Sequence, residues 1–210
     1  MAGSRPRRVR GRLGDVPEAC AAEIEAPRLR LMTTPVGDDR PRPPVAGDEA
    51  STLVGFLDYQ RATLACKCSG LDADQLARTA AASSMTLGGL LNHLARVEDT
   101  WIGHRVTGAA PSEPWASIDV TADPDWEWHS AARTAPSELF ERWRTTVARS
   151  QAQVAEVLAR DGLDRLALRP RSNGEVPSLR WILLHLIEEY ARHNGHADLI
   201  RESIDGQTGE

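Results

Sequence analysis

Apolar residues recur at intervals of three and four in four long stretches of the sequence, which is the period of an amphipathic helix. These stretches cover about 50–68, 86–107, 137–160 and 178–201. No stretch alternates apolar and polar residues as a half-buried strand would. Four long helices, each with one apolar face, predict an all-α fold, a four-helix bundle.

The predicted core of this bundle consists of the apolar faces of the four helices. In chain order its members are Leu53, Phe56, Leu57, Leu64, Cys68, Leu87, Leu90, Leu91, Leu94, Val97, Trp101, Phe140, Trp143, Val147, Val154, Val157, Leu158, Leu179, Ile182, Leu183, Leu186, Tyr190, Ala197 and Ile200. Thr86, Ser137 and Ser178 stand at the starts of the last three helices and are typical N-cap residues.

A connection of about 28 residues separates the second predicted helix from the third, and it contains four prolines and three tryptophans. Loops this long in a compact domain usually have a function. The connection is also long enough to cross the bundle, so that the second and third helices run in the same direction. Its tryptophans, Trp115, Trp126 and Trp128, either line the mouth of a cleft or simply pack the loop against the bundle.

The beginning of the chain is rich in Pro, Gly and Arg. Four prolines between residues 35 and 44 interrupt any helix there, and the first 31 residues hold seven arginines against four acids, a net charge of +3. We predict a disordered tail over 1–48, followed by the bundle domain over 49–208. Met32, followed by Thr-Thr-Pro, reads like a natural start, so residues 1–31 are expected to be an upstream extension.

Composition and cysteine content exclude several classes of function. A net charge of −5 and an isoelectric point near 5.7 give no basis for binding nucleic acid. No stretch reaches the length of a membrane span, and the start lacks the apolar run of a secretory signal. Three cysteines do not make a disulfide framework, so a cytoplasmic location is expected. Cys66 and Cys68 point in different directions on a helix and are expected to be packing thiols.

The last helix carries a polar row beside its apolar face. His185, Glu189, His193 and His196 are spaced by four, four and three residues, so they lie along one stripe. Glu189 and His193 are one turn apart and can both reach one ion, which is how helical bundles build divalent-metal sites. Taken alone, the stripe favours a solvated or hydrogen-bonded polar row over a metal site.

Three further histidines lie outside this stripe. His93 is at the edge of the apolar face of the second helix, three residues after Leu90, where a histidine taken alone is a core residue bonded to a neighbour. His104 is on the same side of that helix but about 16 Å further along its axis, so the two cannot share an ion. His129 falls in the long connection. We therefore exclude His104 and His129 from a shared site.

Two segments together resemble the DinB/YfiT-like superfamily. They are Leu90-Leu-Asn-His-Leu-Ala-Arg-Val-Glu-Asp-Thr-Trp101 and Glu189-Tyr-Ala-Arg-His-Asn-Gly-His196. The likeness covers about residues 32–208 and is to the actinobacterial branch, which includes mycothiol-dependent maleylpyruvate isomerase and mycothiol S-transferases.

The last helix of the wider superfamily carries His-x-x-x-His followed by Arg-Gly-Gln. Here Glu189 takes the first position, as in the mycothiol-dependent isomerase, and Asn194-Gly195-His196 stands in place of Arg-Gly-Gln. The second, C-terminal domain of that isomerase has no counterpart in this sequence, which argues against the isomerase reaction.

The resemblance implies that His93, Glu189 and His193 bind one divalent metal, zinc first, with nickel, iron or manganese as alternatives. A rival ligand set of His93, His193 and His196 stays open, because His193 and His196 are also neighbours on the stripe. If His196 is not a ligand, it is expected to contact the substrate or to support the site by hydrogen bonding. His185 is expected either to be buried or to support the site by hydrogen bonding from outside the ligand set.

The resemblance further implies a metal-dependent transferase that moves a low-molecular-weight thiol, mycothiol, to a small electrophile. Two His and one Glu leave positions open on the metal, and a metal that binds a thiol there promotes its deprotonation. No catalytic residue beyond the metal site is therefore expected, and the electrophile would be selected by the 109–136 connection. The alternative is a non-catalytic, metal-binding stress-response bundle that forms a homodimer through an apolar face. Neither nucleic acid nor a membrane is an expected partner.

Overall fold

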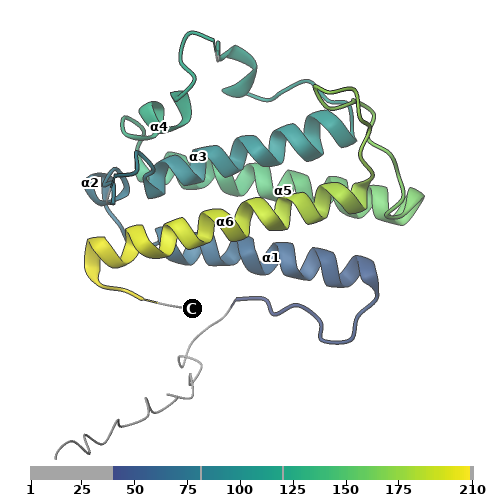
Figure 1. Cartoon of the computed structure of the whole chain (residues 1–210), viewed down its shortest axis with the longest axis horizontal. Coiled ribbons are helices and arrows are strands. Elements are labelled where there is room, and N and C mark those ends of the chain that lie inside the picture. The colour runs from purple at the N-terminus through teal and green to yellow at the C-terminus, as the bar shows by residue number, and fades with distance from the viewer. Residues whose placement is uncertain (1–39, 81, 120, 209–210) are drawn as a thin grey trace, which may run out of the picture. The chain divides into compact units, whose positions relative to one another are not determined.

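The computed structural model describes residues 40–208, apart from 81 and 120. Over those residues the chain is helical and has no strand, only two isolated bridges. The long helices are α1 (Glu49–Cys68), α3 (Leu87–Glu98), α5 (Pro136–Asp161) and α6 (Leu179–Asp205). The predicted all-α bundle is confirmed (Figure 1). No helix in this part of the chain is long and apolar enough to cross a lipid bilayer.

The long connection between α3 and α5 crosses the bundle. The chain leaves α3 through the π-helix η1 (Asp99–Val106) and forms η2 (Trp115–Ser117) and α4 (Trp126–Ala131) before α5 begins. Figure 1 shows that α3 and α5 run in the same direction, whereas α1 and α6 run the opposite way. A short helix, α2 (Ala73–Leu76), joins α1 to α3. The crossover thus returns the chain to the end of the bundle where α3 started.

The π-helical end of the second helix is not visible in the apolar pattern. Asp99, the first residue of η1, is buried, and its carboxylate accepts hydrogen bonds from the backbone N and Oγ of Ser112 at 3.1 and 2.8 Å. Arg149 of α5 donates to the same carboxylate at 2.5 Å. These contacts tie the start of the crossover to both helices. The helix predicted over about 86–107 corresponds to α3 and η1 together, and only its change to π-helical winding at Asp99 was not predicted.

Two of the three predicted N-caps are confirmed. Thr86 Oγ1 accepts a hydrogen bond from the backbone N of Gly89 at 3.0 Å, and Ser178 Oγ accepts one from the backbone N of Trp181 at 3.3 Å. The prediction for Ser137 is wrong, because α5 begins one residue earlier and has no side-chain cap. Proline suits the first position of a helix, since its fixed φ is helical and its missing N–H would be unpaired there.

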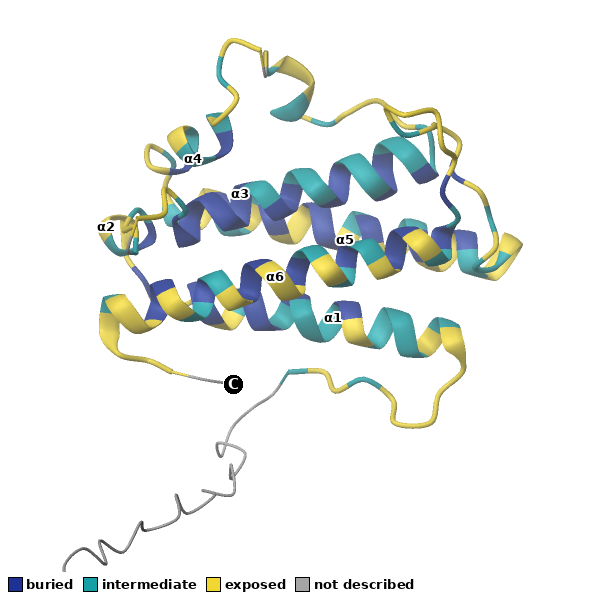
Figure 2. Cartoon of the chain, viewed as in Figure 1, coloured by how far each residue is buried: buried dark blue, intermediate teal, exposed yellow. Residues whose placement is uncertain are grey.

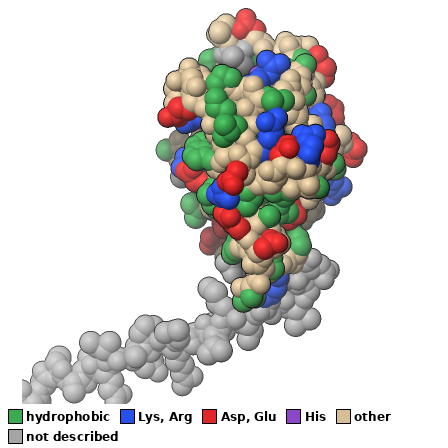
Figure 3. All heavy atoms as spheres, turned by 90° about the vertical axis from the view of Figure 1, so that its right-hand side faces the viewer, with side chains coloured by type: hydrophobic (Ala, Val, Ile, Leu, Met, Phe, Trp, Pro, Cys, Tyr) green, Lys and Arg blue, Asp and Glu red, His purple; other side chains and the backbone are tan. Residues whose placement is uncertain are grey.

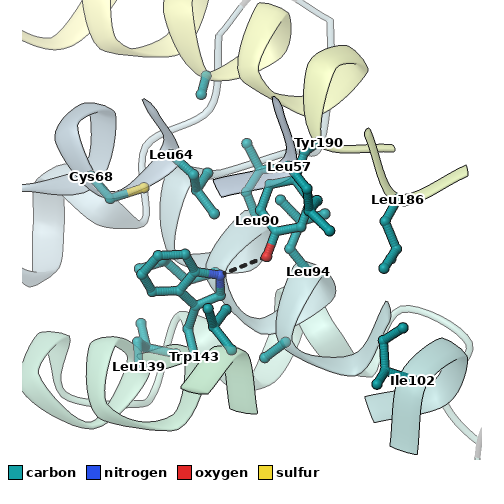
Figure 4. Packing of buried hydrophobic residues seen from close by; sticks show 14 of the residues in the cluster. Leu57, Leu64, Cys68, Leu90, Leu94, Ile102, Leu139, Trp143, Leu186 and Tyr190 are labelled. Atoms are coloured by element: carbon teal, nitrogen blue, oxygen red, sulfur yellow. Dashed lines mark hydrogen bonds between the residues drawn. The ribbon is translucent and has the colours of Figure 1, made fainter. Parts of the chain in front are cut away.

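The buried faces of the long helices point toward one another (Figure 2). Most of the predicted core residues are buried, but Phe56 is 46% exposed, so that prediction is wrong. The neighbouring Leu57 faces the core instead, and the register of α1 turns Phe56 outward. Figure 4 shows the centre of the core, where the Trp143 indole donates a hydrogen bond to the Tyr190 hydroxyl at 3.1 Å. This bond joins α5 to α6.

A buried ion pair links α1 to α3. Arg61 donates from Nε and Nη2 to the two carboxylate oxygens of Glu98 at 2.7 and 2.8 Å, and from Nη1 to Asp58 at 2.8 Å. Glu98 is 0% exposed and Arg61 is 4% exposed, so neither charge is solvated if the other is removed. Burial and the negative charge of Glu98 raise the pKa of Tyr190 well above its usual value, so its hydroxyl stays protonated.

Contacts before and at the start of α1 show which N-terminal residues pack on the bundle. Asp48 accepts a hydrogen bond from the backbone N of Ser51 at 2.7 Å and caps the helix. Before it, Arg40 lies over the ring of Tyr59 at 4.8 Å and donates to Thr63 at 3.0 Å. Residues 40–48, which we assigned to the tail, thus contact the bundle, whereas the rest of the predicted tail lies outside the described residues.

We predict that a chain shortened to begin at Met32 will melt within a few degrees of the full chain. The reason is that the described contacts of the N-terminal segment begin at Arg40, which the shortened chain retains. Thermal unfolding of the two proteins, followed by circular dichroism, makes the comparison. A shortened chain that is insoluble or melts far lower would mean that residues 1–31 pack on the bundle.

Candidate metal centre

Three side chains converge between α3 and α6. His93, Glu189 and His193 each offer one ligand atom, and these atoms all lie within 4.8 Å of one another. Glu189 Oε2 is 3.9 Å from His93 Nε2 and 3.5 Å from His193 Nε2. These separations are longer than charge-assisted hydrogen bonds. The three atoms therefore face a common point without bonding one another closely.

The exposure of the three side chains leaves one side of the cluster open. Those of His93 and Glu189 are 23% and 22% exposed, whereas that of His193 is 8% exposed. The rings of His93 and His193 meet edge to face, with centroids 4.7 Å apart at 67°. Solvent therefore reaches the cluster past His93 and Glu189, while His193 forms the closed side.

Glu127, which the sequence analysis did not identify, hydrogen-bonds to the His93 ring on the side away from the cluster. Its Oε2 lies 2.9 Å from His93 Nδ1, and its Oε1 accepts a hydrogen bond from Arg96 at 2.6 Å. Burial alone would raise the pKa of Glu127, but the hydrogen bond with His93 and the nearby charges of His93 and Arg96 lower it. An ionised carboxylate can only accept, so Nδ1 of His93 carries the proton and Nε2 is free toward the cluster.

The crossover fixes Glu127 through its neighbours. The side-chain amide of Asn92 donates to the backbone carbonyl of Glu127 at 3.1 Å, and Arg142 of α5 donates to Asn92 at 2.6 Å. The ring of Trp128 stacks near His93, with centroids 5.8 Å apart at 19°. Gly89 permits this approach, because a Cβ there would lie 2.0 Å from Trp128 Cε3. The only sequence sign of Glu127 was its place in a long connection that we expected to be functional.

His193 is neutral at physiological pH. Burial, followed by the positive charges of His93 and His196 when they are protonated, lowers the pKa of His193 to about 4. Its Nδ1 lies 3.5 Å from His196 Nδ1, on the opposite edge of the ring from Nε2. His196 therefore touches His193 from outside the cluster of three. This arrangement favours a supporting role for His196 over the rival ligand set.

The other histidines have different surroundings. His185 Nε2 is 3.7 Å from Glu189 Oε1, and its ring stacks on Trp181. His104 Nδ1 bonds the carbonyl of Ala109 at 3.0 Å, and His129 Nδ1 bonds Asp123 at 2.9 Å. None of the three belongs to the converging group of described residues. His185 does border the group, as its place on the stripe suggested.

The donors suit a divalent metal. Two imidazoles and one carboxylate form a mixed nitrogen and oxygen set that zinc accepts, and three protein ligands leave a position for a small molecule. A carboxylate behind a ligating imidazole orients the ring and raises its basicity, and Glu127 stands in that relation to His93. The neutral His193 and the free Nε2 of His93 each present a lone pair.

The described cysteines take no part in this group. Cys66 is exposed, whereas Cys68 is buried and its pKa is raised to about 12 by burial. We expect iodoacetamide to modify Cys66 of the folded protein at neutral pH and to leave Cys68 unmodified, because the thiolate is the reactive form. Peptide mass mapping after brief labelling measures both sites. Equal labelling of the two cysteines would contradict the burial of Cys68.

Comparison with known proteins gives one family. The model of the mycothiol-S-transferase family matches residues 52–206, which contain the three converging side chains and Glu127. A search of curated proteins finds no match. The matched region covers all four long helices except the first residues of α1, so the resemblance noted in the sequence is confirmed. This chain belongs to the mycothiol-S-transferase family.

Proposed function

We propose that this protein transfers mycothiol to a small electrophile and that a divalent metal held by His93, Glu189 and His193 is required. The observation that carries the proposal is the convergence of these three side chains, within 4.8 Å, on a partly open side of the bundle. Zinc is the first candidate, and nickel, iron and manganese are alternatives because occupancy depends on geometry and availability.

The bound metal would supply one effect, a lower pKa for a thiol that binds to it. The protein's residues supply the rest. Glu127 and Arg96 fix the tautomer and orientation of His93, and burial keeps His193 neutral. Trp128 stacks near the His93 ring and adds an apolar side chain beside the site.

The transfer itself needs no nucleophile from the protein. The mycothiol sulfur forms a bond to the electrophilic carbon, the leaving group departs with its electron pair, and the thiol proton passes to solvent. Holding the two reactants together then provides the rate increase.

A thiol-transfer assay tests the proposal. The full chain, loaded with zinc, is mixed with mycothiol and 1-chloro-2,4-dinitrobenzene, and thioether formation is followed by absorbance. We expect the rate to rise with zinc content and to fall toward the uncatalysed rate in Glu189→Gln. The matched control is Glu202→Gln, an exposed carboxylate further along α6, which should retain the activity.

The outcome separates the two functions considered for this chain. A protein that binds zinc tightly but does not accelerate thiol transfer to this or other electrophiles would be a metal-binding bundle without this activity. Equal loss of activity in Glu202→Gln and Glu189→Gln would also contradict the assignment of Glu189.

A further inference from the structure

An aromatic cluster lies between α6 and η1, and its α6 members are one to two turns before the metal centre. Trp181 and His185 are one turn apart, and their rings stack with centroids 5.1 Å apart at 21°. Trp101 of η1 packs against both residues. Its ring centroid lies 5.5 Å from that of Trp181 and 4.5 Å from that of His185. Trp181 is 38% exposed, so part of the cluster faces solvent.

Two arginines flank the aromatic cluster. The guanidinium of Arg105 lies 5.1 Å from the ring centre of Trp101, and that of Arg171 lies 5.0 Å from the ring centre of Trp181. Arg171 also donates to Glu175 at 2.6 Å, and Asn173 donates to the same carboxylate at 2.7 Å. Polar groups with fixed directions therefore stand beside the exposed part of Trp181.

A hollow of about 460 Å³ opens beside Trp181, bordered by Arg171, Glu175, Val176 and Pro177. Val176 is 46% exposed, so an apolar wall faces solvent here together with the polar groups. Figure 3 looks onto the end of the bundle where α6 begins, and it shows hydrophobic side chains among basic and acidic ones. This mixture is suited to a ligand that has both apolar faces and hydroxyl groups.

The aromatic cluster continues into the metal centre through His185. His185 Nε2 is 3.7 Å from Glu189 Oε1, and Trp181 is eight residues before Glu189, about 12 Å along the helix axis. A small electrophile has to meet the thiol sulfur at the metal, so it has no need of a surface at this distance. A thiol that carries sugar rings at some distance from its sulfur would span it.

We propose that the surface formed by Trp101, Trp181, His185, Arg105 and Arg171 binds the sugar part of mycothiol; this inference rests on the proposed function. In mycothiol the cysteine is attached to an amino sugar that is joined to a cyclitol. The C–H groups of such rings pack against exposed tryptophan, while arginine and carboxylate groups bond their hydroxyls. The site would thus select mycothiol among thiols by its rings, whereas the metal takes its sulfur.

Binding of the glucosaminyl-inositol fragment, which lacks the cysteine, tests this surface without any transfer reaction. Calorimetric titration of the zinc-loaded full chain should show saturable binding. We expect Trp181→Ala to weaken it about tenfold or more and Trp181→Phe to retain most of it. Leu199→Ala, an exposed position near the other end of the same helix, is the matched control and should bind as the wild type does.

A second variant guards against misfolding of Trp181→Ala. Arg171→Gln changes a loop side chain and should also weaken binding of the fragment, with the melting temperature and zinc content unchanged. In the transfer assay, both variants should raise KM for mycothiol but not for N-acetylcysteine, which has no sugar.

The possible failures can be told apart. No binding of the fragment by the wild type overturns this inference, whether or not the protein transfers thiols. A rise in KM for the electrophile instead of mycothiol also overturns it and assigns the surface to the electrophile. If the fragment binds as expected but no thiol is transferred, the proposed function fails while the sugar-binding surface stands.

Discussion

Glu98→Ala should lower the free energy of unfolding by about 3–5 kcal/mol, because it leaves Arg61 as a buried charge without its main partner. Glu98 accepts two hydrogen bonds from Arg61, at 2.7 and 2.8 Å, and is 0% exposed. Asp58 also bonds Arg61, but from a partly exposed position, so it can replace little of the lost interaction. Urea unfolding followed by circular dichroism measures the loss.

Two further variants show whether the loss comes from the ion pair. Glu141→Ala removes an exposed carboxylate on α5 and should change stability by less than about 0.5 kcal/mol. Removing both charges in an Arg61→Met, Glu98→Leu double variant should recover much of the lost stability, since no buried charge then remains. A double variant as unstable as Glu98→Ala would show that the network's shape, and not its charge balance, stabilises the core.

Glu127→Gln should weaken zinc binding about 10- to 100-fold, the usual cost of losing the carboxylate behind a ligating histidine. The substitution keeps the size of the side chain but removes the charge that holds the proton on Nδ1 of His93. Competition with a chromogenic chelator measures the affinity. A loss of metal affinity at an unchanged melting temperature of the metal-free protein would identify an orienting role for Glu127.

The matched control for Glu127 is another glutamate of the crossover. Glu113 accepts a hydrogen bond from Ser117 at 2.8 Å on the surface, and Glu113→Gln should bind zinc as the wild type does. Equal zinc affinity in Glu127→Gln and the wild type would mean that packing alone orients the His93 ring for metal binding. Equal loss in both variants would point to a general effect of charge on the crossover.

The sequence allowed the bundle and most of the candidate site to be predicted because both depend on helical periodicity. Leu90 and Leu94 mark the buried face of α3, and His93 lies beside them at the edge toward α6. Glu189 and His193 were paired by their spacing alone. Periodicity could not show that His93 lies next to that pair, because the contact is between two helices. The inclusion of His93 in the ligand set came from the family resemblance.

The features that were missed depend on contacts between elements that are distant in the sequence. Glu127 follows no periodic pattern, and it reaches His93 only because the crossover returns over α3. The outward turn of Phe56 depends on the register in which α1 packs. The π-helical turns of η1 are accompanied by the bonds of Asp99 with Ser112 and Arg149, residues 13 and 50 positions away. Spacing within one helix contains none of this information.

Metal analysis of single alanine variants tests the central claim most directly. The full chain, its alanine variants at 93, 189 and 193, and those at 185 and 196 are loaded with zinc, freed of excess metal and analysed for zinc per chain. We predict about one zinc per chain in the wild type, His185→Ala and His196→Ala, and loss of zinc in His93→Ala, Glu189→Ala and His193→Ala. Full occupancy in His93→Ala would contradict the site as a whole, and full occupancy in Glu189→Ala with loss in His196→Ala would show that the three histidines are the ligands instead.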